Sequence, residues 1–170
     1  MKYAAIFMIV LVVIGLGLGV YTYANAHLSL LEVSMTAAQG FERAADFSAL
    51  QAAMDQGALL GTAFADSLPG SNMDYTFETY TFRLRNPGLI DAEMVEITPL
   101  PAEGDMLAFA TLDAAQVNAN LTVPAGSERD AWCTLLVSAN QDELTRYQRR
   151  FRVTYYIWGM QKTETVRYQQ

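Results

Sequence analysis

The first 24 residues constrain this chain most, because they form an apolar run long enough to cross a membrane. Residues 4–20 contain no polar side chain, and tyrosines flank the run at both ends. About 20 apolar residues in a helix span a bilayer core of about 30 Å, and interfacial aromatic residues are typical of the ends of such a helix. We therefore predict a transmembrane helix that contacts the lipid bilayer through residues 4–24.

The charges on either side of this run predict its orientation. Lys2 precedes the run, and the first acidic or basic residue after it, apart from His27, is Glu32. Positive charge is retained on the cytoplasmic side of a membrane span. We expect a single-pass protein of the cell membrane with its N-terminus in the cytoplasm and its C-terminal domain outside it.

A cleavable signal peptide is the alternative interpretation of the same residues. Ala24-Asn25-Ala26 fits the small-x-small pattern of a cleavage site, and a basic residue precedes the apolar core. The apolar run is longer than the usual core of about 7–15 residues, which favours a retained anchor. Both interpretations place the rest of the chain outside the cytoplasm.

Charge and cysteine content limit the partners and the covalent chemistry. The net charge of −7 argues against nucleic acid as a partner, because binding phosphate backbones depends on lysine and arginine. Cys133 is the single cysteine, so no disulfide can form within the chain. It lies in the apolar run AWCTLLV, where we expect a buried, unreactive thiol.

From residue 75 onward the sequence alternates with the period of a β-strand. Tyr80, Phe82 and Leu84 share one face of the first such segment, and arginines and threonines share the other. Short strands separated by turn residues predict an antiparallel β-sandwich. The predicted strands are 75–85, 92–97, 106–112, 119–123, 129–137, 147–158 and 161–168.

Residues 27–74 depart from this pattern. We predict a strand or extended link at 27–37, a helix at 48–56 that packs on a sheet, and then a turn-rich connection. Ser48 and Gln51 have the spacing of a capping box at the start of that helix. The expected organisation is an anchor at 1–26, a membrane-proximal segment at 27–74 and a sandwich at 75–170.

Two turn segments in the sandwich resemble those of a known family. Asn86-Pro87-Gly88 is followed by a strand that starts Asp91-Ala92-Glu93, and Val123-Pro124-Ala125-Gly126-Ser127 precedes another strand. Both are similar to turns in the immunoglobulin-like, cell-adhesion-related modules of bacterial extracellular proteins. The resemblance covers about residues 75–168 and implies a fold rather than an activity.

Residues able to carry catalysis or bind a metal are few and dispersed. His27, the sole histidine, is far along the chain from Cys133, and a catalytic pair would need them together. On a strand Asp91 and Glu93 share one face and Glu96 lies on the other, so we expect no metal site and no cofactor. Across a tight hairpin, Arg83 and Arg85 would face Asp91 or Glu93 as surface charge pairs.

The most unusual local feature of this acidic chain is the run at 145–152. It holds four of the eleven basic residues, and two large aromatic residues follow on the same strand: the set is Arg146, Arg149, Arg150, Arg152, Tyr156 and Trp158. One interpretation is a protected strand edge with the aromatic residues in the core. The other is a docking patch for an acidic partner or an anionic cell-wall polymer.

These observations favour a membrane-anchored, extracytoplasmic domain that binds or scaffolds a protein partner without catalysis, as an accessory subunit of an envelope complex. A secreted adhesion or binding module released after Ala26 is the first alternative. An enzyme that acts on envelope material through Asp91 and Glu93 is the second. Asn120-Leu121-Thr122 also matches a glycosylation sequon.

Overall fold

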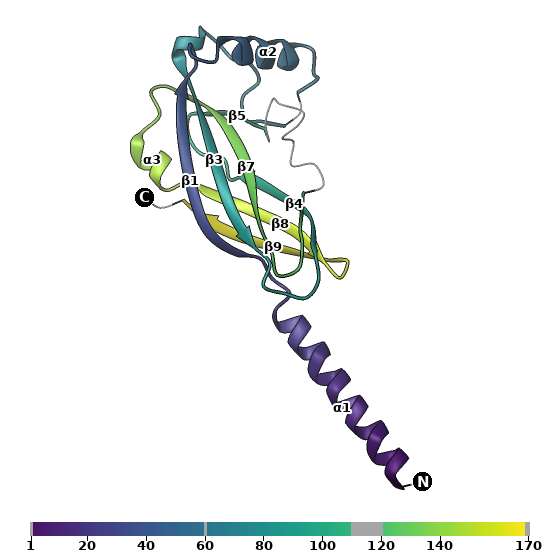
Figure 1. Cartoon of the computed structure of the whole chain (residues 1–170). Helices are drawn as coiled ribbons and strands as arrows, with labels where there is room; N and C mark the ends of the chain where they lie inside the picture. The colour runs from purple at the N-terminus through teal and green to yellow at the C-terminus, as the bar shows by residue number, and fades with distance from the viewer. Residues whose placement is uncertain (1, 60, 110–120, 169–170) are drawn as a thin grey trace.

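A computed structural model describes residues 2–59, 61–109 and 121–168, and Figure 1 shows the whole chain. The helices are α1 (Lys2–Ala24), α2 (Ala44–Asp55), the 3-10 helix η1 (Asn72–Asp74) and α3 (Glu143–Tyr147). The strands are β1 (Ser29–Gln39), β2 (Thr62–Ala63), β3 (Tyr75–Arg85), β4 (Ala92–Pro99), β5 (Asp105–Phe109), β6 (Leu121–Val123), β7 (Glu128–Ser138), β8 (Arg150–Ile157) and β9 (Met160–Arg167). The protein is therefore mainly β, as the alternation predicted.

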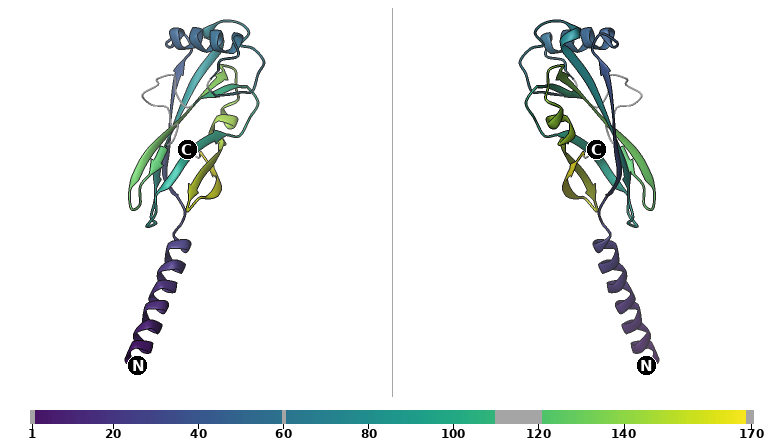
Figure 2. Two further views of the ribbon diagram at one scale, coloured as in Figure 1. Left: turned by 90° about the vertical axis from the view of Figure 1, so that its right-hand side faces the viewer. Right: turned by 90° about the vertical axis from the view of Figure 1, so that its left-hand side faces the viewer.

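The described strands form two antiparallel sheets that face each other. One has five strands in the order β1-β3-β7-β5-β2, and the other has four in the order β6-β4-β8-β9. Figure 2 shows the two layers and α2 lying across one end of them. The predicted β-sandwich is confirmed. Of the predicted strands, residues 110–112 and 119–120 lie outside the described part of the chain, as does Asn120 of the sequon.

The main core lies between the two sheets. Tyr80, Phe82 and Leu84 of β3 point into it and are at most 1% exposed, as their spacing predicted. Alternate residues of β8 enter from the opposite sheet, so that the rings of Phe82 and Phe151 pack edge to face with centroids 4.8 Å apart. The Cys133 thiol is buried in the same core, as expected.

A second, smaller core lies on the outer face of the five-stranded sheet, under α2. Phe47 and Leu50 of this helix are buried against Tyr75 and Phe77, which are the outward-facing residues at the start of β3. The helix was predicted to pack on a sheet, and it does. The capping box at Ser48 was wrong, because α2 begins four residues earlier and the Ser48 hydroxyl donates a hydrogen bond to the Ala44 carbonyl.

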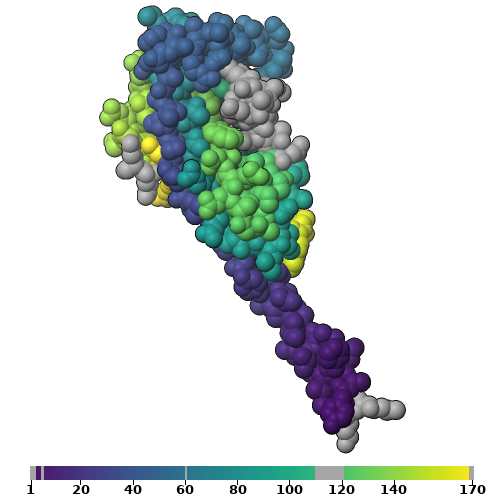
Figure 3. Space-filling view, in the orientation of Figure 1, coloured from purple at the N-terminus to yellow at the C-terminus, as the bar shows by residue number. Residues whose placement is uncertain are grey.

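The N-terminal helix projects from the other end of the sandwich. Its residues Ile6–Ala24 are long and apolar enough to cross a membrane, and none of that stretch is buried inside the protein. In the space-filling view α1 stands clear of the folded domain (Figure 3). The sequence prediction of an apolar helix of spanning length is therefore confirmed.

The helix enters the domain without a free linker. Ala26 and Leu28 are both buried in the main core, and the Leu28 N–H donates a hydrogen bond to the hydroxyl of Tyr155 on β8. A Cβ on Gly88 would lie 2.8 Å from the backbone oxygen of Asn25, so this glycine permits the loop after β3 to lie against the end of the helix. The sandwich is thus fixed to the end of α1.

Candidate functional site

The structure separates the basic run into an internal part and an exposed part. Arg149 is 1% exposed, and it lies between the sheets next to α3. The run was predicted to be one surface patch, and for Arg149 that prediction is wrong. The strand predicted from Tyr147 begins only at Arg150, because Glu143–Tyr147 form α3, and Arg149 enters the interior just before β8.

Arg149 is held by a network of buried polar groups. Its Nη1 donates hydrogen bonds to both carboxylate oxygens of Asp105, at 2.7 and 2.6 Å, and its Nη2 donates to Gln141 Oε1 at 3.1 Å. Nη2 also lies 3.8 Å from Glu78 Oε2, which accepts a hydrogen bond from the Tyr80 hydroxyl. Within the described residues, Nε of Arg149 has no hydrogen-bond partner.

The charges of this network compensate one another in the interior. Burial opposes a charge on Arg149, but the hydrogen bonds and the negative charge of Asp105 outweigh it and raise the pKa of Arg149. Burial, and then Glu78 beside the hydroxyl, raise the pKa of Tyr80. The guanidinium therefore stays charged and the phenol stays neutral, which makes this network structural.

Arg146 belongs to the same network rather than to a free surface. It donates a hydrogen bond from Nε to Glu78 Oε1, and its side chain is 22% exposed while that of Glu78 is fully buried. Arg146 reaches Glu78 from α3, whose last turn it occupies. Only a small part of the Arg146 side chain is therefore accessible to a partner.

The remaining residues of the predicted patch lie on the outer face of the four-stranded sheet. Arg150 and Arg152 are exposed, and Tyr156 is half-buried on the same face of β8. Trp158 follows in the turn to β9 and is 50% exposed. The alternative that placed both aromatic residues in the core does not hold, since neither belongs to the two core clusters of the described residues.

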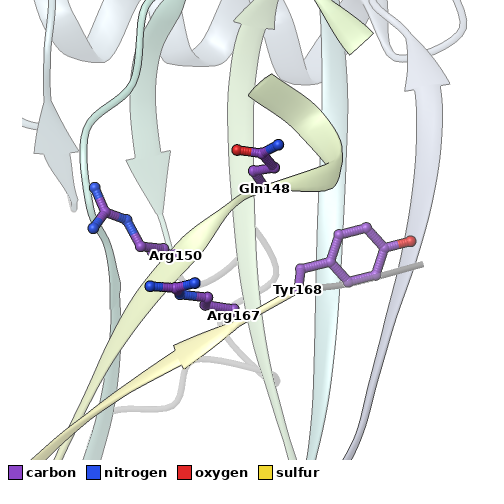
Figure 4. Close-up of a pocket in the computed structure, with 4 residues that line it drawn as sticks. All are labelled: Gln148, Arg150, Arg167 and Tyr168. Carbon is purple, nitrogen blue, oxygen red and sulfur yellow. The ribbon is translucent and has the colours of Figure 1, made fainter. Parts of the chain in front are cut away.

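Gln148 and Arg167 are two polar residues near this face that were not predicted from the sequence. A pocket of about 480 Å³ is lined by Gln148, Arg150, Arg167 and Tyr168 (Figure 4). Arg150 and Arg167 are directly opposite each other on β8 and β9. The sequence did contain a signal: counting outward from a two-residue turn at Trp158-Gly159 pairs position 150 with position 167.

Figure 4 shows how the four side chains lie. Both guanidinium groups point to the same side of the hairpin, and the Gln148 carboxamide lies beyond Arg150 toward α3. The Tyr168 ring points the other way and packs edge to face on Tyr80, with ring centroids 5.4 Å apart. The polar groups available to a ligand are therefore the two arginines and the glutamine.

The acidic candidates from the sequence do not converge. Asp91 accepts a hydrogen bond from the Ala125 N–H at 2.8 Å and so joins two loops. Glu93 and Glu96 are exposed on the same face of β4, opposite Tyr156 and Thr154 of β8, because a bulge lies between them; their predicted placement on opposite faces was wrong. No group of three or more His, Cys, Asp or Glu side chains suited to a metal is found in residues 2–59, 61–109 and 121–168. His27 is exposed while Cys133 is buried in the core.

The predicted charge pairs across a β3–β4 hairpin were wrong. These two strands belong to different sheets, so Arg83 cannot face Asp91 or Glu93 across a ladder. Arg83 instead lies between Glu32 of β1 and Asp130 of β7, at 3.4 and 3.3 Å, and Arg85 lies opposite Glu128. Surface charge pairing was expected correctly, but with the wrong acidic partners.

Comparison with known proteins gives no further indication of the site. No protein-family model matches the sequence, and no curated protein is significantly similar to it.

Proposed function

We propose that this chain is a single-pass membrane protein whose extracytoplasmic β-sandwich binds a protein partner and has no catalytic role. The observation that carries the proposal is the continuity between α1 and the sandwich. An exposed apolar helix of spanning length runs directly into a folded core through Ala26 and Leu28. This direct connection would hold the sandwich next to the bilayer, with the end that adjoins α1 facing the membrane.

The end of the sandwich next to α1 is suited to a membrane surface. Leu89 lies in the loop that touches Asn25, and Trp158 lies in the β8–β9 turn at the same end of the molecule (Figure 1). Leu89 is 58% exposed and Trp158 is 50% exposed. Tryptophan is enriched at membrane–water interfaces. Lys162 lies 5.4 Å above the ring of Tyr23 and so links β9 to the end of the helix.

Burial of Ala26 favours a retained anchor over release after that residue. Cleavage there would remove a side chain that is 7% exposed and place a charged amine on His27, next to the buried Leu28. A charged group near an apolar core costs free energy unless it is paired. The alternative of a secreted adhesion or binding module released after Ala26 is weaker for this reason.

We also propose that the sandwich is immunoglobulin-like. The order β1-β3-β7-β5 corresponds to strands A, B, E and D of the constant-type fold, and β4-β8-β9 corresponds to C, F and G. Asn86 of the shared turn segment is fully buried and bonds to the backbone of Ile90, Val123 and Gly88. The strand order and the contacts of Asn86 support an immunoglobulin-like fold. Such a fold is compatible with the proposed binding function.

The binding surface is the outer face of the four-stranded sheet. It presents Arg150, Arg152 and Tyr156 from β8, and arginine and tyrosine are enriched at energetically important interface positions. We favour binding over an envelope-acting enzyme because Asp91 serves a loop contact and Glu93 is solvent-exposed on a strand.

Site-directed labelling of intact cells tests the membrane placement. Gln56 is exposed beside α2, at the end of the domain far from α1. In a Cys133→Ala background, Gln56→Cys should react with a membrane-impermeant maleimide without permeabilisation, and the labelled protein should stay in the membrane fraction at full-length mass. Labelling only after permeabilisation would contradict the orientation, and a soluble product lacking residues 1–26 would contradict the anchor.

A further inference from the structure

Two arginines face each other on the exposed hairpin, and no acidic side chain among the described residues pairs with either of them. Arg150 and Arg167 are in direct register on β8 and β9, so their Cβ atoms are about 4.5–5.5 Å apart. Like charges in such positions destabilise a sheet. Within the described residues, no ion pair involves either arginine, or Arg152 two positions along β8.

This arrangement is unusual in a chain with acids in excess. The protein carries 18 acidic residues against 11 basic ones, and its buried Arg149 and surface Arg83 both have carboxylate partners. Repulsion between Arg150 and Arg167 is a cost that a bound anion would remove. The pocket they line, about 480 Å³ in volume, gives such an anion a place to sit.

We propose that Arg150 and Arg167, with the Gln148 carboxamide, form a carboxylate-binding site that takes acidic side chains of a protein partner. The inference rests on the proposed binding function and specifies the chemistry of its ligand. Each guanidinium presents a planar fork of donors that matches a carboxylate in a bidentate pair. Gln148 adds an amide donor at the same pocket (Figure 4).

The charge of the whole domain favours a short acidic segment over a long polyanion. Charges attract effectively within a Debye length of about 8 Å at physiological salt. A few carboxylates fit within that distance of the two arginines. An extended polymer would also lie along the remaining surface of a protein with net charge −7, which would repel it.

The position of the pocket separates it from the membrane that the chain spans. It lies at the start of β8 and the end of β9, seven residues from the last residue of β8 before the turn. At about 3.3 Å per residue, the strand places roughly 20 Å between the pocket and that turn. Because the turn belongs to the end of the domain next to α1, lipid headgroups of the same membrane are not the source of the anion.

Binding of a hexaglutamate peptide to the full chain in zwitterionic detergent micelles tests the site. We expect saturable binding by fluorescence anisotropy that weakens with added salt and is absent for hexaglutamine. Arg150→Gln with Arg167→Gln should weaken binding at least tenfold. Arg129→Gln is the matched control, because Arg129 is exposed on β7 and makes no ion pair with a described residue; it should change the affinity less than twofold.

The same variants give a second measurement that does not depend on the peptide. Replacing the two facing like charges with glutamine should raise the thermal midpoint of the free protein, whereas Arg129→Gln should leave it unchanged. In the wild type, hexaglutamate should raise the midpoint, and in the double variant it should not. A double variant that fails to fold is recognised by circular dichroism, and Arg167→Gln alone then takes its place.

Three outcomes would overturn the proposal. The first is no hexaglutamate binding at millimolar concentration, and the second is an equal loss of affinity in Arg129→Gln. The third is tighter binding of inorganic phosphate or polyphosphate than of hexaglutamate, which would assign the pocket to phosphate groups. None of them alters the labelling of Gln56→Cys in cells, so failure of this site is distinguishable from failure of the membrane placement.

Discussion

Arg149 and Asp105 form a doubly hydrogen-bonded ion pair in the interior, with distances of 2.7 and 2.6 Å from Nη1 to the two carboxylate oxygens. Both side chains are fully buried. Removing charges from water costs several kcal/mol for each ion, and only the mutual attraction and the surrounding hydrogen bonds offset this cost. The pair is therefore sensitive to loss of either partner.

Asp105→Asn should destabilise the full chain by about 3–5 kcal/mol, because it leaves a buried guanidinium without its closest charge. Urea unfolding in detergent, followed by tryptophan fluorescence, measures the change. Asp130→Asn removes the acid from an exposed pair with Arg83 and should cost about 1 kcal/mol or less. Equal losses in the two variants would contradict the structural role of the buried pair.

The alternating strands could be predicted from the sequence, but the position of Arg149 could not. The apolar residues at every second position of β3 and β8 have no other way to be buried, so the core followed from the pattern. The run 145–152 gives no sign of an acidic partner that would let an arginine be buried, although the alternation of Phe151 and Val153 extended back puts position 149 on the inward face. Its division depends on α3, and on acids from β3 and β5 that lie far away in sequence.

The pocket at Arg150 and Arg167 was missed for a different physical reason. Arg167 is an ordinary exposed strand residue until the hairpin register places it opposite Arg150. That register depends on Trp158 and Gly159, both at positive φ, which together make a two-residue turn. The incorrect pairing of Arg83 arose because Asn-Pro-Gly was interpreted as the turn of a hairpin. At this turn the chain instead crosses from β3 to β4 in the other sheet.

Tyr155→Phe should loosen the junction between α1 and the sandwich. The hydroxyl accepts a hydrogen bond from the buried Leu28 N–H at 3.1 Å and donates one to Glu164. An unsatisfied buried N–H costs about 1–3 kcal/mol. We expect a loss of that size in urea unfolding and faster hydrogen exchange at the Leu28 amide. Tyr156→Phe, on the outer face of the same strand, is the control and should leave exchange at Leu28 unchanged.

Stability should fall at alkaline pH in part because of Cys133. Burial raises the pKa of its thiol from 9.0 to about 12, so the folded state keeps a proton that the unfolded state releases. The folded pKa is the higher one, so this contribution is complete below pH 9 and is lost as pH rises toward 12. Between pH 9 and 10 the loss should approach about 1 kcal/mol.

Comparing Cys133→Ala with the wild type isolates this contribution. The variant is expected to be less stable at neutral pH because it leaves a small cavity, but its stability should decline less between pH 9 and 10. Buried Tyr80 and Tyr155, whose pKa values burial also raises, continue to destabilise both proteins above pH 10. Identical slopes over that interval would show that the thiol does not titrate with unfolding.

Trp158→Asn should stabilise the β8–β9 hairpin. Trp158 has φ of 57° and Gly159 has φ of 68°, so both residues of the turn are left-handed. A bulky residue is strained there, whereas Asn-Gly is the preferred pair for such a turn. Trp158 is 50% exposed, so little packing is lost. We expect a gain of about 0.5–1 kcal/mol in urea unfolding in micelles. Trp158→Phe keeps the strain and should show no gain, and a less stable Trp158→Asn would mean that the indole packs more tightly than its exposure indicates.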